Sequence, residues 1–227
     1  YTARHAAPTT THKIADHEEF PTLSYSFDWD TLGSWDSTYM ITIAYLPNGD
    51  LAERITNQHN GFDFTPESRQ TVTYSGLSTT YINEYWSGSA WENSSKYETT
   101  DDNFGNATLD VYYTWSSSQW DTVNGNRITY QYTLTDKVAQ SHIESWNQNT
   151  HLWENDYLEQ YAWPNASGWD TVTYSTWNGS SWDLYDRYVD VTWHDFSNFS
   201  PITARYQSYN APVWEDVERL MATYGPN

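Results

Sequence analysis

Pairs of aromatic residues recur along this chain at nearly constant intervals, and no other feature constrains its fold as strongly. The stretch "WNGSSWDLYDRY" (177–188) places two tryptophans on either side of four small residues, and "WSGSAWENSSKY" (86–97) repeats the arrangement. The first members of the pairs are Trp86, Trp115, Trp146, Trp177 and Tyr209; the second are Trp91, Trp120, Trp153, Trp182 and Trp214, preceded in the same rhythm by Trp35 and Phe64. Steps of 27 to 33 residues between them indicate a repeat architecture. Seven units of one kind therefore fill the chain after about residue 25.

Each unit contains a second turn signal, which lies halfway between the aromatic pairs. These turns are "LPNGD" (46–50), "SGLS" (75–78), "DDNFGN" (101–106), "TLTDK" (133–137), "WPNASG" (163–168) and "HDFSN" (194–198). Gly, Pro, Asn and Asp favour turns for known backbone reasons. Between the turns, apolar and polar residues alternate, as in "YMITIAY" (39–45) and "RITYQYTL" (127–134). This period of two predicts antiparallel strands with one apolar face.

The aromatic pairs are predicted to close hairpins. Two residues separated by four others fall opposite each other across a hairpin end, where they pack face against edge and contribute about 0.5–1.5 kcal/mol beyond burial. A base follows the second aromatic by five residues in four units, at Arg69, Lys96, Arg187 and Arg219. One unit delays its base to Arg127, and Leu158 takes the position in another.

We therefore predict an all-β protein: a long antiparallel meander of about seven hairpin repeats of roughly 30 residues each, forming a single domain over residues 23–227. So many strands would be expected to curl or fold on themselves, in a barrel-like or sandwich-like way. Residues 1–22 lack the repeat and are predicted to form an extended arm. That arm either packs along its own sheet or adds to the sheet edge of a neighbouring copy, which would make the chain a polymerising subunit.

The charge of the chain limits its partners. Thirty Asp and Glu oppose ten Lys and Arg, for a formal net charge of -20. This charge repels phosphate backbones and anionic lipids, so neither nucleic acid nor membrane insertion is expected. The sequence has no cysteine and no apolar run of membrane-spanning length, and it opens at "YTARHAAP" without methionine. We read this opening as a processed end, and expect an extracellular or cell-surface protein.

The sequence predicts no catalytic residues and no enzyme. It has no Gly-x-Ser-x-Gly elbow, no cysteine nucleophile and no zinc-like histidine spacing. Two acids can hydrolyse a glycoside when they converge, and Asp28 with Asp30 or Glu84 with Glu98 are the formal candidates. Acids at repeat positions are better explained as solvated or paired with the repeat's bases.

One turn has the composition of a weak cation site. Asp101, Asp102, Asn103 and Asn106 in "DDNFGN" supply clustered hard oxygens, which suit calcium. The spacing is not that of an EF-hand, and an ordinary polar turn is the favoured interpretation. Calcium is the sole cofactor considered.

The segment "EYWSGSAWENSSKYETTDDNFGNAT" (84–108) carries a pattern, W-x-G-S-x-W-E followed by K/R-x-Y and D-x-x-G-N, that extends over roughly residues 25–220. It resembles the Trp/Tyr-rich β-repeats of proteins that Bacteroidota secrete to the cell surface. The resemblance implies an extracellular, adhesive or fibre-forming role without catalytic residues. It also implies O-glycosylation at Asp-Ser/Thr motifs, here at Thr31, Ser37, Thr122 and Thr171.

Two functions follow. The first is an extracellular structural or adhesive protein that forms a homo-oligomer or a filament through its N-terminal arm. The alternative is a carbohydrate-binding module, in which exposed aromatic rings stack on the sugars of a polysaccharide. Its ligand-binding residues would be Trp86, Trp91, Trp115, Trp120, Trp177 and Trp182.

Overall fold

The computed structural model describes residues 22–29, 35–164, 168–197 and 199–224, with the backbone alone for residues 27–29 and 35–37. Every regular element in these ranges is a β-strand. The strands are β1 (Leu23–Trp29), β2 (Trp35–Tyr45), β3 (Leu51–His59), β4 (Phe64–Ser75), β5 (Ser78–Trp86), β6 (Trp91–Asp101), β7 (Ala107–Ser116), β8 (Gln119–Tyr132), β9 (Val138–Asn147), β10 (Leu152–Ala162), β11 (Thr171–Trp177), β12 (Trp182–Asp195), β13 (Ser200–Asn210) and β14 (Val213–Met221).

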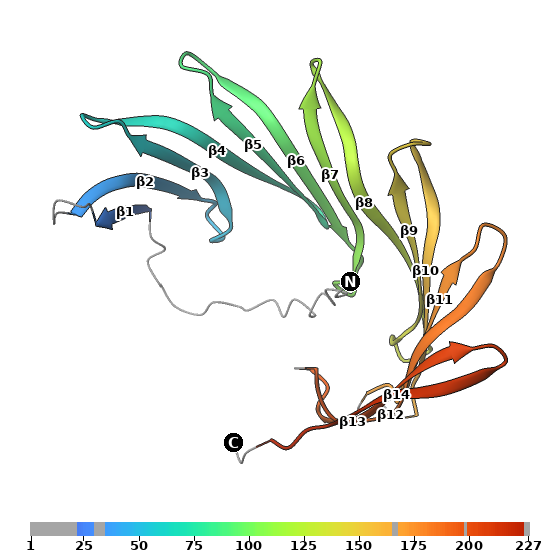
Figure 1. The fold of residues 1–227 in the computed structure, drawn as a ribbon. Coiled ribbons are helices and arrows are strands. Elements are labelled where there is room, and N and C mark those ends of the chain that lie inside the picture. The colour runs from blue at the N-terminus through green and yellow to red at the C-terminus, as the bar shows by residue number, and fades with distance from the viewer. Residues whose placement is uncertain (1–21, 30–34, 165–167, 198, 225–227) are drawn as a thin grey trace. The chain divides into compact units, whose positions relative to one another are not determined.

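The strands form one antiparallel meander. Their order in the 14-stranded sheet is the order of the sequence, so each strand pairs with its sequence neighbours (Figure 1). This confirms the predicted all-β hairpin repeat. The sheet is not closed: its order begins at β1 and ends at β14, so the barrel-like alternative does not occur. No helix in the described ranges has the length and apolar character needed to cross a bilayer.

The described residues divide into two compact units, and the boundary passes through β7 and β8. The N-terminal unit contains the residues up to Phe104 together with Asp110–Gly125, and the C-terminal unit contains Gly105–Leu109 and the residues from Asn126 onward. The predicted arm, residues 1–22, lies outside the described residues except for Thr22. The carbonyl of Thr22 accepts a hydrogen bond from the N–H of Ile43 in β2 (2.9 Å).

The aromatic pairs close the hairpins, as their spacing predicts. The indole rings of Trp86 and Trp91 lie edge to face with centroids 5.2 Å apart, and those of Trp115 and Trp120 are 4.8 Å apart. The further pairs are Trp146–Trp153, Trp177–Trp182, Tyr209–Trp214 and His59–Phe64. His59 is therefore the first member of the pair that Phe64 completes. In the first hairpin the backbone register places Trp29 opposite Trp35.

A β-bulge follows six of these closures at a fixed position. In six hairpins the register gains one residue on the second strand, always the third residue after the second aromatic. The extra residues are Thr38, Glu67, Ser94, Asp156, Tyr185 and Val217. Residues two apart share a face of a strand, and one extra residue reverses that parity beyond it. The base at the fifth position therefore lies on the same face as the aromatic pair, and the residue at the fourth position lies on the opposite face.

Few apolar side chains are buried in the described residues. The buried ones are small, namely Val72, Val111, Val172, Val189, Val191 and Ala204. Most other side chains on both faces are half-buried or exposed. The packing of each unit therefore depends on contacts made along the two faces of a single sheet. We call the face that carries the Trp pairs the indole face, and the face that carries Val172, Tyr188 and Tyr206 the tyrosine face.

Removing a bulge tests this arrangement. Deletion of Ser94 turns Lys96 to the opposite face of β6 or moves Trp91 off its partner, so we expect it to lower the free energy of unfolding by more than about 2 kcal/mol. The control is Ser94→Ala, which keeps the register at an exposed position and should cost less than about 0.5 kcal/mol. Urea unfolding followed by tryptophan fluorescence measures both. Equal stability of the two variants would contradict the assigned role of the bulge.

Candidate functional site

The bases of the repeat lie over aromatic rings of the following hairpin. The guanidinium carbon of Arg69 in β4 is 5.0 Å from the centroid of Trp91 in β6, and Arg187 in β12 is 4.3 Å from Trp214 in β14. Lys96 with Trp120 and Arg127 with Trp153 repeat the contact at 5.7 and 5.5 Å. Such cation–π contacts contribute about 0.5–2 kcal/mol, depending on exposure. They connect four hairpins of the indole face to the hairpin that follows each of them.

A residue of the intervening strand holds each base in place. Arg69 donates to both carboxylate oxygens of Glu84 (2.6 and 2.9 Å), and Arg127 does the same to Glu144 (2.7 Å each). The hydrogen bonds that Arg69 donates to Glu84 raise the pKa of Arg69. The pKa of Arg127 is raised by Glu144 in the same way, so both arginines stay charged over the indole rings that they contact.

Lys96 is held by two neighbours. It pairs with Glu98 (2.9 Å) and lies 3.9 Å from the ring of Tyr113, whose hydroxyl donates to Glu98 (2.7 Å). Burial acts to raise the pKa of Glu98, but the hydrogen bonds from Lys96 and Tyr113 together hold it below its usual value. The three groups form one connected unit between β6 and β7.

In the unit that lacks a base, a histidine makes the contact to the next hairpin. Leu158 stands at the base position of β10, and its cross-strand partner in β9 is His142. The His142 ring lies edge-on to Trp182, with centroids 5.4 Å apart, and its Nε2 is 2.8 Å from the Oδ1 of Asn155. The contact to the next unit is thus kept by a different residue.

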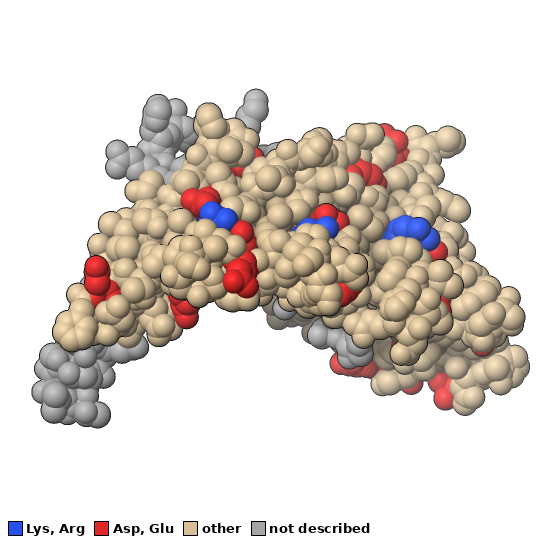
Figure 2. Space-filling view, turned by 90° about the horizontal axis from the view of Figure 1, so that it is seen from above, with Lys and Arg blue, Asp and Glu red and all other residues tan. Residues whose placement is uncertain are grey.

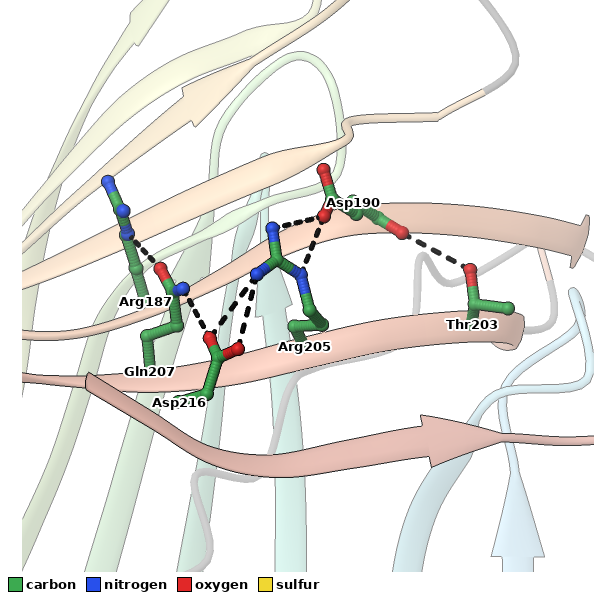
Figure 3. Close-up of polar contacts among 6 residues, drawn as sticks. All are labelled: Arg187, Asp190, Thr203, Arg205, Gln207 and Asp216. Carbon is green, nitrogen blue, oxygen red and sulfur yellow. Dashed lines mark hydrogen bonds and ion pairs between the residues drawn. The ribbon is translucent and has the colours of Figure 1, made fainter. Parts of the chain in front are cut away.

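The last hairpins carry a longer polar network on the indole face (Figure 3). Arg187 donates to Gln207 (2.7 Å), which donates to Asp216. Arg205 bridges Asp216 (3.3 Å) and Asp190 (2.7 Å). Asp190 has a positive φ of 54°, in an irregular part of the β12–β13 pairing, and this conformation turns its carboxylate toward Arg205. These residues fix the register of three strands.

Figure 2 shows the Lys and Arg side chains of one surface as a few separate patches, each bordered by Asp or Glu. The two formal catalytic pairs can be placed only in part. Glu84 and Glu98 are engaged with Arg69 and Lys96, and they are not cross-strand partners, since Glu84 pairs with Asn93. Asp30 and the side chain of Asp28 lie outside the described residues.

The six tryptophans predicted to bind ligand are half-buried parts of the hairpin closures on the indole face. At the predicted calcium turn, Asp102 accepts the N–H of Phe104 (2.8 Å) and Asn106 donates to the Tyr132 hydroxyl (2.8 Å). Within the described ranges, no three His, Asp or Glu side chains are grouped as metal ligands. Of the predicted glycosylation sites, Thr122 in β8 and Thr171 in β11 are half-buried, whereas Thr31 and the side chain of Ser37 lie outside the described residues.

The tyrosine face of the C-terminal unit holds an open cleft of about 300 Å³. It is lined by Trp169, Tyr174, Tyr188, Val191, Trp193, Phe199, Pro201, Ala204, Tyr206, Glu218 and Leu220. Cross-strand pairing aligns its floor, because Val172 pairs with Tyr188, Tyr188 with Tyr206, and Tyr206 with Glu218. The rings are mutually supported: Tyr188 and Tyr206 have centroids 5.1 Å apart.

One end of the cleft is formed by a cluster around Trp193. Its ring lies 5.0 Å from Trp169 and 5.8 Å from Phe199, and its Nε1 donates to the carbonyl of Trp169 (2.7 Å). A Cβ at Gly168 would lie 2.4 Å from the Trp193 ring, so the wall can form only with glycine there. This close approach fixes the indole before any ligand arrives.

Acids surround the tyrosines of the cleft. Asp186 is buried and accepts a hydrogen bond from Tyr206, and Glu159 is the cross-strand partner of Tyr174. Burial first, and then the charges of these acids and of Glu218, raise the pKa values of Tyr174, Tyr188 and Tyr206. The phenols therefore remain protonated, neutral and able to donate hydrogen bonds at neutral pH.

The sequence analysis did not find this cleft. Asp186 and Glu218 both stand four residues after the second aromatic of their units, at Trp182 and Trp214. The recurrence of an acid at this fourth position could have indicated the cleft. Without knowledge of the bulge, however, the side chains at this position would be assigned to the indole face. The recurrence of Tyr174, Tyr188 and Tyr206 on neighbouring strands was the second available signal.

Comparison with known proteins adds little. No protein-family model and no curated protein matches the sequence. Solved structures that resemble the chain include a Bacteroides fragilis protein of unknown function (14% identity, 53% of this chain and 91% of that chain, TM-score 0.38). A DUF3836 family protein from Bacteroides vulgatus is 21% identical (39% and 87%, TM-score 0.30), and a porin-like protein from Bacteroides uniformis is 9% identical (87% and 93%, TM-score 0.28). The neighbours are thus Bacteroides proteins, and likeness at this level carries no argument about function.

The acids of the indole face predict a pH-dependent stability. The hydrogen bonds from Arg127 hold the pKa of Glu144 below its usual value, against burial, which acts to raise it. A carboxyl with a lowered folded-state pKa stabilises the protein above its unfolded pKa, and this contribution is lost as the pH falls through the folded pKa. We expect Glu144→Gln to be less stable than the parent chain near neutral pH, with the difference shrinking between about pH 6 and about pH 3.

Urea midpoints measured across that pH range provide the test. Glu67→Gln, at an exposed bulge position of β4, is the matched control and should not differ from the parent chain at any pH. A stability difference for Glu144→Gln that is the same at every pH would contradict the assigned ion pair.

Proposed function

We propose that this chain is an extracellular adhesive protein that binds polysaccharide through the tyrosine cleft and performs no catalysis. The cleft carries the proposal: six aromatic side chains line an open space of about 300 Å³ on one face of the sheet. Aromatic faces bind the C–H faces of sugar rings, and hydroxyls beside them fix orientation. The volume lies at the lower end of the range for ligand sites, about 300–1,000 Å³, which suits a short segment of a chain lying across the sheet.

The geometry favours this cleft over the predicted tryptophans as the ligand site. Trp177 and Trp182 contact each other, and Trp91 is covered by Arg69, so these rings are half-buried against protein groups. Tyr188 also contacts Tyr206, but it is 37% exposed in the open cleft. An extracellular location is part of the proposal, since polysaccharides large enough to lie across a sheet are found there and a strongly acidic surface keeps an aromatic-rich protein dissolved.

Two alanine variants distinguish the two faces. We expect Tyr188→Ala to weaken binding of soluble glycan oligomers about tenfold or more, because it removes the central ring of the cleft. Trp177→Ala should lower the thermal midpoint but leave affinity nearly unchanged. Affinity is measured by quenching of tryptophan fluorescence and by calorimetry, on variants whose circular dichroism shows folded protein. Loss of binding in Trp177→Ala alone would instead place the ligand on the indole face.

A second candidate, a filament subunit, is favoured by the open sheet edges. Strand β14 has one neighbour and exposes Val217 (61%), Leu220 (41%) and Met221 (72%), although it also carries charged residues. A sheet edge with one neighbour can accept a further strand from another copy. Residues 1–22 are the segment that we propose as the donor.

If this assembly forms, deletion of residues 1–22 should leave single particles, and Val217→Lys on β14 should weaken polymerisation by charging the accepting edge. Negative-stain microscopy and sedimentation velocity measure both variants against the full chain. Filaments that persist without residues 1–22 would exclude the arm as donor.

A further inference from the structure

The cleft described above is negatively charged. None of its eleven lining residues is Lys, Arg or His, and one is Glu218. The buried carboxylate of Asp186 contacts the lining residue Tyr206, and Glu159 lies beside Tyr174. Anionic ligands, such as polymers of uronic acids or sulfated sugars, would meet carboxylates without a compensating base.

The alternation of side chains along a strand separates the two signs of charge, and the β-bulge decides which face receives the acids. Asp186 precedes Arg187, and Glu218 precedes Arg219, so neighbouring opposite charges exist in the sequence. The bulges at Tyr185 and Val217 direct the acids to the tyrosine face. Arg187 lies on the indole face over Trp214, where it also donates to Gln207. The cleft therefore keeps its acids without their sequence-adjacent bases.

The carboxylates in and beside the cleft also differ in the number of hydrogen bonds that they accept. Glu159 accepts hydrogen bonds from Ser141 (2.6 Å) and Tyr161 (2.7 Å). The side-chain carboxylate of Glu218 makes no hydrogen bond or ion pair to any residue within the described ranges, although it lines the cleft beside Tyr206. A ligand that covers Glu218 with a neutral group would remove water from a carboxylate without replacing the lost hydrogen bonds, which is costly.

From this charge complementarity we propose that the cleft selects glycans with free primary amines, that is, chains of 2-amino-2-deoxy sugars in their ammonium form. The ring faces stack on Tyr188 and Trp193, and the ammonium groups pair with Glu218 and lie against the neutral tyrosine faces, where a cation is favoured. This inference rests on the proposed polysaccharide-binding function and adds the substrate class.

The test compares three hexasaccharides by calorimetry at about pH 5.5, where the amine is protonated: the glucosamine hexamer, its N-acetylated counterpart and cellohexaose. We expect the glucosamine hexamer to bind about tenfold more tightly than the two neutral oligomers, with a preference that falls in about 0.5 M NaCl. Equal affinities would overturn the amine preference and leave the proposed function standing. Absence of binding by all three would overturn both.

Variants separate the cleft from general attraction to an acidic protein. Glu218→Gln should lose most of the preference for the amine while keeping the affinity for the neutral oligomers, and Tyr188→Ala should weaken all three. Glu67→Gln removes the same charge from an exposed position of the N-terminal unit and should change nothing. Equal effects of Glu218→Gln and Glu67→Gln would show non-specific attraction and would contradict the proposal.

Discussion

The one-residue bulge that follows six of the aromatic closures is the constraint on which the rest of this sheet depends. An uninterrupted strand would place the fourth residue after the second aromatic on the indole face and the fifth on the tyrosine face. The bulge exchanges them, so Lys96 and Arg187 come to lie under the indoles of the next hairpin. In the six hairpins with this bulge the extra residue occupies the third position, so the exchange occurs at the same place in each of them. Arg69, Lys96 and Arg187 therefore reach the ring of the following hairpin in the same way. The aromatic pair anchors the register from which that position is counted.

These contacts supply the stabilisation that a buried apolar core supplies in most domains. The buried apolar residues in the described ranges are six small side chains, and no larger one reaches the same burial. Closures and cation–π contacts each contribute about 0.5–2 kcal/mol, four of the seven units supply both, and these contacts connect nearest neighbours only. Stability should then accumulate unit by unit, as in other repeat proteins. In the unit that has Leu158 at the base position, a contact between the rings of His142 and Trp182 replaces the cation–π contact.

The sequence predicts the strands and the hairpin closures well, because both rest on local spacing. The alternation in "YMITIAY" and the distance from Trp86 to Trp91 are direct consequences of strand and hairpin geometry. The assignment of side chains to faces could not be predicted in the same way. No chemical property is common to the bulged residues, which are Thr38, Glu67, Ser94, Asp156, Tyr185 and Val217. The residue type therefore does not predict where the side chains change face. Regular spacing predicts Trp177 as a ligand-binding residue, whereas the position of Tyr188, three residues beyond the bulged Tyr185, on the opposite face could not be predicted.

The two faces are consequently not independent. Tyr188 and Tyr206 are aligned because β12 and β13 keep their register, and that register is held from the indole face by Arg187, Gln207 and Asp216. A ligand on the tyrosine face meets rings already positioned by mutual contacts, which reduces the entropy lost on binding. A change in the indole-face network would loosen this alignment without touching the ligand. Such a change would weaken affinity through reduced preorganisation, whereas removal of Tyr188 weakens it through lost contact.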